Sequence, residues 1–157
     1  MEEHKKFIKA AVEAALKGMQ NNEGGPFGCV IVKDGKIIAK GVNKVTVNND
    51  PTAHAEVTAI REATKILNTF DLAGCEIYTS CEPCPMCLGA IYWAHLDKIY
   101  YANTKVDAKN IGFDDAFIYD EIMLPIKNRH LPTIQILPDK AIEAFVKWEN
   151  KEDKIEY

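Results

Sequence analysis

The sequence lacks any block of basic residues, and this absence argues against a nucleic acid partner. Its 19 Lys and Arg are outnumbered by 23 Asp and Glu, which gives a formal net charge of −4. The two signs are mixed along the chain. A protein that binds the phosphate backbone concentrates its basic residues on one face or in one segment. We therefore expect no tRNA or DNA partner.

Long apolar runs and a framework of paired cysteines are missing as well. No stretch approaches the roughly 20 apolar residues of a membrane-spanning helix, and Met1–Lys6 has no apolar core like that of a signal peptide. The cysteines number five, and Cys29, Cys75 and Cys81 show no pairing pattern. Structural disulfides belong to oxidising compartments. The sequence therefore predicts a soluble, cytoplasmic protein with no membrane partner.

The glycine-rich stretch Gly24–Gly28 also lacks the features of a phosphate-binding loop. No Lys followed by Ser or Thr comes after it, and the next segment is predicted to be a strand instead of a helix. We interpret the stretch as a turn. Phe27, inside it, is either a core residue or an aromatic wall of a pocket, and the sequence leaves both open.

Length and hydrophobic periodicity predict one α/β domain over residues 1–157. Apolar residues that recur every three or four positions favour helices, and short runs rich in β-branched residues favour strands. Asp34–Gly35 between two such runs is typical of a hairpin turn. The predicted helices are Glu3–Gln20, Thr52–Leu67, Asp114–Met123, Asp139–Asn150 and one that opens near Cys84; the predicted strands are Cys29–Val32, Ile37–Ala39, Glu76–Thr79, Lys98–Ala102 and Thr133–Leu137. Five strands interleaved with helices indicate a three-layer α/β/α sandwich.

Two cysteines at a predicted helix start are the strongest chemical signal in the chain. Cys84 and Cys87 are three positions apart, so their side chains share one face of the helix. Pro83 and Pro85 suit a helix start, where the positive helix end favours ionised thiols. Two thiolates that point the same way form half of a zinc site.

His54 and Glu56 complete the predicted site from an earlier helix. The imidazole of His54 offers a third ligand, and a zinc ion with three protein ligands keeps one position for water, whose pKa it lowers to about 7. Glu56 is spaced to stand beside the metal without binding it and to carry protons between that water and a substrate. We therefore predict a catalytic zinc site with His54, Cys84 and Cys87 as ligands and Glu56 as the acid–base residue.

Other interpretations of these residues stay open at this point. Cys81 could be a fourth ligand, which would make the zinc structural. Cys84 and Cys87 could instead form a redox pair of the thioredoxin type, although such a pair needs no His-x-Glu. Asn43, at the end of a predicted strand, is either a turn former or a ligand contact.

With these motifs in place, the chain resembles the cytidine deaminase-like superfamily and, within it, the family of bacterial guanine deaminases. His-x-Glu followed by Pro-Cys-x-x-Cys is the signature of zinc deaminases. The resemblance covers essentially the whole chain, and its most specific segments are Gly25–Gly28, Asn48–Glu56, Thr79–Ala94, Gly112–Asp115 and Glu156–Tyr157. The first three are shared in part with tRNA adenosine deaminases and cytosine deaminases, whereas the last two point to guanine.

The resemblance implies a mixed five-stranded sheet in the order 2-1-3-4-5 and a homodimer whose C-terminal segments, about residues 138–157, are exchanged between subunits. It implies that Tyr157 closes the active site of the other subunit. It also implies contacts of the purine with Asn43 and Asp115, and walls made by Phe27, Trp93 and His54. The choice between Asp114 and Asp115 stays open.

The implied reaction is the hydrolysis of guanine to xanthine and ammonia, with Zn²⁺ as cofactor and guanine as the small-molecule partner. Glu56 would act first as base and then as acid, protonating ring N3 and later the departing amine. Two rival functions remain: another nucleobase or tRNA adenosine deaminase of the same superfamily, and a non-catalytic interaction domain stabilised by zinc.

Overall fold

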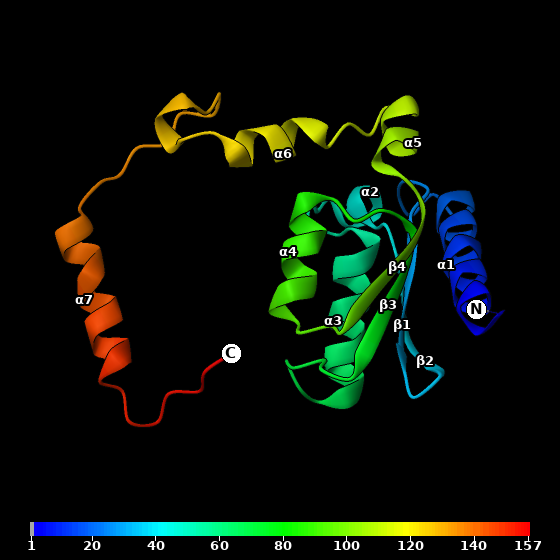
Figure 1. The fold of residues 1–157 in the computed structure, drawn as a ribbon, viewed down its shortest axis with the longest axis horizontal. Coiled ribbons are helices and arrows are strands. Elements are labelled where there is room, and N and C mark those ends of the chain that lie inside the picture. The colour runs from blue at the N-terminus through cyan, green and yellow to red at the C-terminus, as the bar shows by residue number, and fades with distance from the viewer. Residues whose placement is uncertain (1) are drawn as a thin grey trace. The chain divides into compact units, whose positions relative to one another are not determined.

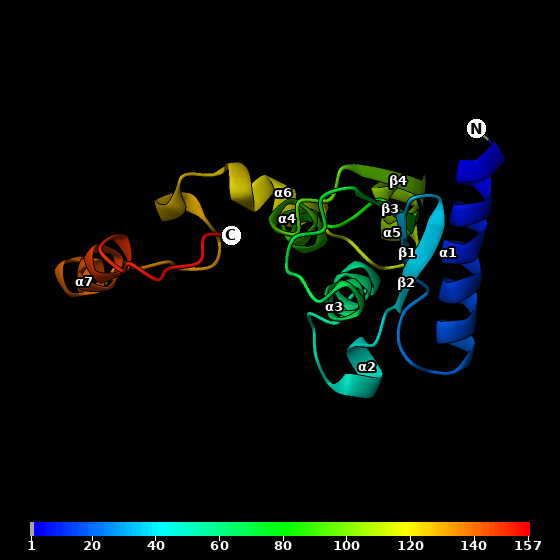
Figure 2. The ribbon, with the colours of Figure 1, turned by 90° about the horizontal axis from the view of Figure 1, so that it is seen from below.

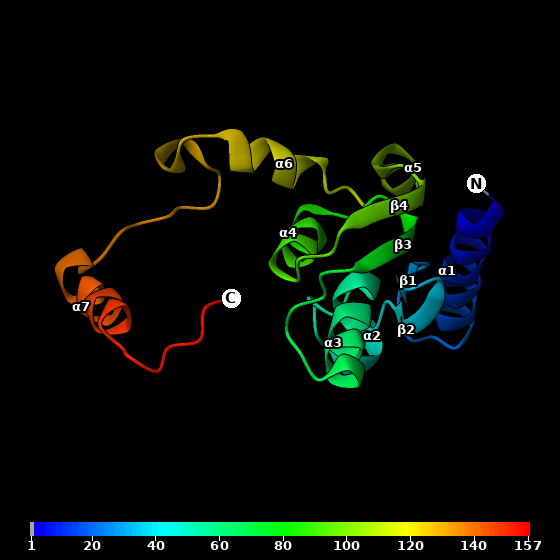
Figure 3. The same ribbon diagram turned by 60° about the horizontal axis from the view of Figure 1, so that its bottom comes forward.

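A mixed four-stranded sheet organises the first of two units in the computed structural model, which describes residues 2–157. The chain divides after Ala116, and the second unit is Phe117–Tyr157. The strands are β1 (Gly28–Lys33), β2 (Lys36–Val42), β3 (Cys75–Cys81) and β4 (Lys98–Asn103). Their order is β2-β1-β3-β4, with β2 and β4 at the edges (Figure 3). β1 runs antiparallel to both neighbours, whereas β3 and β4 are parallel.

Helices cover both faces of this sheet. α1 (Glu2–Gln20) lies on one side, and α3 (Ala55–Leu67) and α4 (Pro85–Trp93) lie on the other (Figure 1, Figure 2). The alternation of β1 explains this arrangement, because successive side chains of a strand point to opposite faces. Val30 packs with Phe7 of α1, whereas Ile31 packs with Ala59 of α3. The predicted three-layer α/β/α arrangement is confirmed for this unit.

The local turns follow from the residues that form them. Asp34 and Gly35 both have positive φ, 49° and 71°, as the predicted hairpin turn requires. The helix predicted from Thr52 begins only at Ala55. The reason is Asp50, whose Oδ1 accepts hydrogen bonds from the backbone N–H and the hydroxyl of Thr52 at 2.8 and 2.7 Å, and so holds Thr52 in a turn.

Two short helices complete the first unit. α2 (Val45–Asn48) follows β2, and α5 (Lys105–Asn110) follows β4. The start of α5 is fixed by a capping box in which Thr104 and Asp107 bond each other's backbone N–H groups. This cap sets the path of the chain between β4 and residues 111–116.

The second unit is helical, and the strand predicted over Thr133–Leu137 is wrong. The unit contains α6 (Ala116–Met123) apart from its first residue, a 3-10 turn η1 (Ile126–Asn128) and α7 (Pro138–Glu149). Residues 132–137 have no regular secondary structure. Ile134 and Ile136, at alternate positions, favour an extended strand conformation. A strand forms, however, only where its backbone pairs with that of a neighbouring strand. The described sheet therefore has four strands in the order 2-1-3-4, not five in the order 2-1-3-4-5.

The second unit buries none of its residues within the chain described. Large apolar side chains including Leu131, Ile134, Ile136 and Phe145 are at least 74% exposed. Isolated segments of this size cannot bury enough apolar surface to be stable alone. Across residues 2–157, no helix combines the length and apolarity that crossing a membrane would require.

Candidate active site

One end of the sheet gathers the residues that the sequence singles out. β1 starts there while β2 and β3 end there, because Gly28 pairs with Val42 and Cys29 pairs with Thr79. The Gly28 N–H also donates to Ser80 Oγ at 3.0 Å, which fixes the end of β3 against the start of β1. α3 and α4 both begin just after segments that leave this edge.

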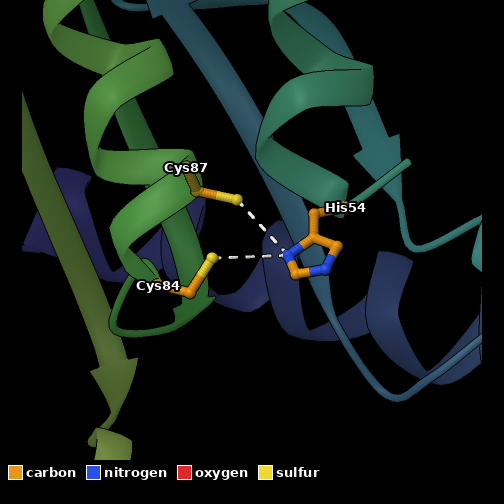
Figure 4. Close-up of side chains that lie close together, drawn as sticks. All are labelled: His54, Cys84 and Cys87. Carbon is orange, nitrogen blue, oxygen red and sulfur yellow. Dashed lines mark hydrogen bonds between the residues drawn. The ribbon is translucent and has the colours of Figure 1, made fainter. Parts of the chain in front are cut away.

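His54, Cys84 and Cys87 come together at the starts of these two helices. His54 is the N-cap residue of α3, Cys84 is the N-cap residue of α4, and Cys87 lies in the first turn of α4. The Nδ1 atom of His54 points between the two sulfurs and lies 3.5 Å from each (Figure 4). The three potential ligand atoms all lie within 4.8 Å of one another.

This geometry fits a zinc ion. Zinc binds thiolate sulfur at about 2.3 Å and imidazole nitrogen at about 2.0 Å, so tetrahedral coordination separates the nitrogen from each sulfur by about 3.5 Å. The two distances in the structure are both 3.5 Å. The site can therefore take a tetrahedral ion with little movement of its side chains.

Cys81 does not join the cluster, so the structural-zinc interpretation loses its fourth ligand. Among residues 2–157, the side chains close enough to hold one metal ion together are those of His54, Cys84 and Cys87. The Cys81 thiol donates to the carbonyl oxygen of Thr104 at 3.6 Å, and burial raises its pKa to about 11. Three protein ligands leave one coordination position for a water or a substrate.

The pKa values of the two cysteines are shifted in opposite directions. The pKa of Cys84 is lowered chiefly by its contact with the Cys87 sulfur, and next by the His54 ring. The pKa of Cys87 is raised by that same contact and by burial. The pKa of His54 is raised chiefly by its bond to Cys84. These pKa shifts arise because the two sulfurs and the imidazole ring are packed closely together, and all three are groups that a metal cation would bind.

Glu56 stands beside the cluster without belonging to it. Its Oε2 atom accepts a hydrogen bond from Cys87 Sγ at 3.3 Å, and the residue is buried, with 7% exposed surface. Burial is the main reason why its pKa is raised. A raised pKa suits a carboxyl group to take up and release protons as an acid–base residue.

Asn43 and Asp115 are two further polar side chains near this end of the sheet that could form hydrogen bonds with a ligand. Asn43 is 6% exposed, and the backbone N–H of Lys44 next to it donates to the carbonyl of Ala53, directly before His54. Asp115 has a buried Oδ1 atom with no hydrogen-bond partner among the described residues. Burial raises the pKa of Asp115, with Cys84 contributing to the shift.

Asp114 differs from its neighbour because its carboxylate is already engaged. It forms an ion pair with Lys109 at 3.1 Å and accepts the backbone N–H of Ala116 at 3.1 Å. The Lys109 ammonium group lowers the pKa of Asp114. Of the two aspartates, Asp115 is the one left to interact with a ligand.

Phe27 has the first of the two roles that the sequence left open, a core residue, and its role as a wall of a pocket stays a prediction. It packs against the core on the α3 and α4 side of the sheet. Its ring also meets Phe113 edge-on, with centroids 4.9 Å apart. Because Phe113 lies two residues before Asp115, this contact helps to fix the segment that carries the aspartate.

Within the first unit, Trp93 does not lie at the cluster, and Tyr157 is part of the second unit. Trp93 is the last residue of α4, nine positions after Cys84, which corresponds to about 13 Å along a helix axis, and it is 67% exposed. Tyr157 belongs to the second unit and is 73% exposed. Their assignment as substrate contacts stays a prediction.

Gly24 and Gly25 are functional candidates that sequence reasoning passed over as turn residues. Gly25 N–H donates to the side-chain oxygen of Asn43 at 3.2 Å, and an added Cβ at Gly24 would lie 2.2 Å from that oxygen. The signal for this contact is the pairing of β1 with β2, which brings the glycine turn before β1 next to Asn43 at the end of β2. Composition does not give the register of that pairing.

Comparisons with known proteins agree with this site. The family model described as "Cytidine and deoxycytidylate deaminase zinc-binding region" matches residues 1–103. Guanine deaminase of Bacillus subtilis (strain 168) is 54% identical over 154 residues, which cover 98% of this chain and 99% of the relative. An X-ray structure of guanine deaminase from Bacillus subtilis matches with a TM-score of 0.95 and 54% identity over 98% of each chain. The tRNA-specific adenosine deaminase of Aquifex aeolicus (strain VF5) is 42% identical over 143 residues, covering 91% of this chain and 82% of the relative.

Proposed function

The chain belongs to the cytidine and deoxycytidylate deaminase family with its zinc-binding region, and we propose that it is a zinc-dependent guanine deaminase. It converts guanine and water to xanthine and ammonia. The observation that carries this proposal is the cluster of His54, Cys84 and Cys87 with the buried Glu56 beside it, in a chain that resembles a guanine deaminase along its whole length.

We propose His54, Cys84 and Cys87 as the zinc ligands. When bound there, Zn²⁺ supplies an acidified, oriented water molecule at the fourth coordination position. The chain's own catalytic residue is Glu56, which accepts a proton from the attacking water as its oxygen adds to C2 of the purine. Glu56 gives this proton to ring N3, then takes the proton of the hydroxyl group now on C2 and passes it to the amino group, so that the C–N bond breaks, ammonia leaves and the C2 carbonyl of xanthine forms.

Three side chains of the same unit are proposed to hold the purine. Phe27 offers an apolar surface next to the core, Asn43 offers an amide, and Asp115 offers a carboxyl oxygen without a protein partner. A purine needs an apolar surface for its ring and polar groups for its edges. His54, besides binding the metal, forms part of the wall.

We also propose that two copies of the chain complete each other's sites. The second unit has no buried residue, and its apolar side chains need a surface to cover them. An exchanged segment of about residues 138–157 would cover them on a second copy and carry Tyr157 to that copy's site. Trp93 is proposed to line a face of the purine together with Phe27 and His54.

We place the enzyme in the cytoplasm, with guanine and no nucleic acid as its partner. All five cysteines are free thiols, which suits a reducing compartment. The mixed charges of the sequence offer no basic block for RNA.

The test is an assay of ammonia release from guanine, adenine, cytosine and tRNA, with zinc content measured on the same preparation. We expect turnover of guanine by protein that holds one zinc per chain. Faster turnover of tRNA adenosine or of cytosine would contradict the assignment of guanine. Zinc-loaded protein with no activity on any substrate would favour an interaction domain.

A further inference from the structure

His54 begins α3 without capping it. The N-cap residue of a helix commonly turns a side-chain oxygen back to the exposed N–H groups of the first turn, and this contact fixes where the helix starts. His54 makes no such bond, because its ring is directed toward the sulfurs of Cys84 and Cys87 (Figure 4). Other contacts must therefore fix the segment that carries this proposed metal ligand.

Asp50, four residues before His54, supplies contacts of this kind within the loop. Its Oδ1 atom accepts hydrogen bonds from the backbone N–H of Thr52 at 2.8 Å and from the Thr52 hydroxyl at 2.7 Å. The Asp50 carbonyl accepts the N–H of Ala53 at 3.1 Å, and the Thr52 carbonyl accepts the N–H of His54 at 2.8 Å. The chain from Asp50 to His54 is therefore a series of linked turns.

The same residue also contacts the elements on either side of this loop. The N–H of Asp50 donates to the Val45 carbonyl of α2 at 3.1 Å. Its Oδ2 atom lies 3.7 Å from Nη1 of Arg61, about two turns along α3. Asp50 therefore joins α2, the loop before His54 and the helix that follows His54.

The hydrogen bonds to Thr52 are the stronger part of this arrangement. They are short, and they hold the pKa of the Asp50 carboxyl below its usual value. The ion pair is weaker, because the side chains of Arg61 and Asp50 are 58% and 35% exposed, and exposed ion pairs contribute little. A neutral side chain that accepts the same two bonds should therefore replace Asp50.

We propose that Asp50 is a positioning residue for the zinc ligand His54, whose ring it holds in the metal-binding position through its hydrogen bonds to Thr52. This inference rests on the zinc site of the proposed function. A ligand binds more weakly to a site that is correctly arranged only part of the time, because the apparent affinity falls by that fraction. Asp50 is not one of the three clustered ligands, so its loss should weaken zinc binding and leave the chemistry of zinc-loaded protein unchanged.

Asp71 offers a matched control elsewhere in the chain. Its Oδ1 atom accepts the N–H of Ala73, two residues further on, at 3.0 Å, which is the same local turn that Asp50 forms with Thr52. Asp71 lies before β3, and its ion-pair partner is His95, which is not one of the clustered ligands. D71A therefore removes the same kind of bond without touching the segment that carries His54.

The experiment measures the zinc dissociation constant of the wild type, D50A, D50N, T52V and D71A by competition with a chelator at one pH. The melting temperature of each zinc-free protein shows whether the variant is folded. In D50N the amide oxygen still accepts both bonds from Thr52, whereas D50A accepts neither and T52V loses only the hydroxyl bond. The kcat for guanine is then measured at saturating zinc.

We expect D50A to bind zinc about tenfold more weakly than the wild type, at the lower end of the range of about 10–100-fold that lost contacts behind a metal ligand cost. D50N and D71A should stay within about threefold of the wild type, because neither loses a bond to Thr52. T52V should lie between D50A and the wild type. At saturating zinc, D50A should keep the wild-type kcat.

The inference is overturned if folded D50A binds zinc as tightly as D71A, or if D50N binds it as weakly as D50A. Where D50A does not fold, T52V decides, and zinc affinity equal to that of the wild type rejects the inference. Zinc-loaded wild type without activity on guanine would overturn the proposed function alone, because zinc affinity is measured without substrate. If H54A leaves zinc affinity unchanged, the metal site itself is wrong and both proposals fall.

Discussion

Glu56 combines the properties that a proton-transfer residue needs. It is buried, its carboxylate lies 3.3 Å from a sulfur of the metal cluster, and it is not one of the three clustered ligands. Replacing it with glutamine keeps the shape of the side chain and removes its ability to carry a proton. Burial of the neutral amide costs less than burial of the charged form, so the fold should tolerate the change.

The first prediction is that E56Q retains zinc and loses at least about 10²-fold in kcat, which is the usual contribution of general acid–base catalysis. Metal analysis and steady-state kinetics on one preparation would check it. E62Q is the control, because Glu62 is an exposed carboxylate of the same helix. E56Q with wild-type turnover would remove Glu56 from the reaction.

Asp114 and Asp115 form a natural pair for a second prediction. Asp115 has a buried, unpartnered oxygen, whereas Asp114 is engaged with Lys109 at the surface. D115N should raise KM for guanine about tenfold or more. The amide oxygen is a weaker acceptor than a carboxylate oxygen, and the amide NH₂ group is a donor where the carboxylate had an acceptor. D114N should change KM by less than about threefold, since exposed ion pairs contribute little. Equal effects of D115N and D114N on KM would contradict the assignment of Asp115, and not Asp114, as the contact of the purine.

Local sequence patterns sufficed for the metal ligands but not for the residues around them. The spacing of Cys84 and Cys87 fixes their common helix face, and spacing is a property of the chain itself. The orientation of Asn43 depends on the backbone of Gly25, eighteen residues away, and the choice between Asp114 and Asp115 depends on where Lys109 lies. Such contacts exist only once the strands have paired.

At the scale of the elements, the face of the sheet covered by α1 carries a cluster of polar side chains formed by His4, Glu76 and Tyr78. Tyr78 of β3 is fully buried, donates its hydroxyl hydrogen to Glu76 at 2.7 Å, and lies 2.7 Å from Nδ1 of His4. Since the hydroxyl has one hydrogen, His4 must be the donor in the second bond. Tyr78 therefore links α1 to the sheet, on the side opposite the metal cluster.

The third prediction is that Y78F lowers the free energy of unfolding by about 1–3 kcal/mol, because two short, part-buried hydrogen bonds are lost while the buried ring stays packed. Denaturant unfolding would measure the change. Y100F is the control, since the Tyr100 hydroxyl donates one long hydrogen bond to Glu76, at 3.4 Å. The KM for guanine should not move in either variant. A shift in KM with Y78F would place this cluster in the catalytic site.

The sequence predicts the elements whose backbone hydrogen bonds are local, such as helices and tight turns. It does not predict whether a strand finds a distant strand to pair with. The hairpin at Asp34–Gly35 follows from the positive φ that its turn requires, and α1 and α3 follow from their apolar periodicity. The expected strand Thr133–Leu137 had the composition of a strand and lacked a neighbour to pair with. Strand propensity describes a fit to a half-buried sheet surface, so it carries no information about whether that surface is present.

Considered as a whole, the molecule has one unit with a packed core and one without. The sheet and its helices bury their apolar residues in two clusters, one on each face. Residues 117–157 bury none, although they include large apolar side chains such as Phe145 and Ile136. Exposed apolar surface on this scale is typical of a surface that another protein covers. The proposed exchange with a second copy of the chain would cover it in both copies at once, because exchange around a twofold axis is reciprocal.

The fourth prediction tests this exchange by complementation. E56Q keeps an intact C-terminus and has a disabled site, whereas Y157A keeps Glu56 and lacks the tyrosine that should close the site of the other subunit. Each variant alone should have little activity. When the two chains are co-expressed in equal amounts, about half of the dimers are mixed, and each mixed dimer has one complete site of two. Specific activity should then recover to about a quarter of the wild-type value. If Tyr157 acts within its own chain, no complete site can form, and the mixture should show only the average of the two separate variants.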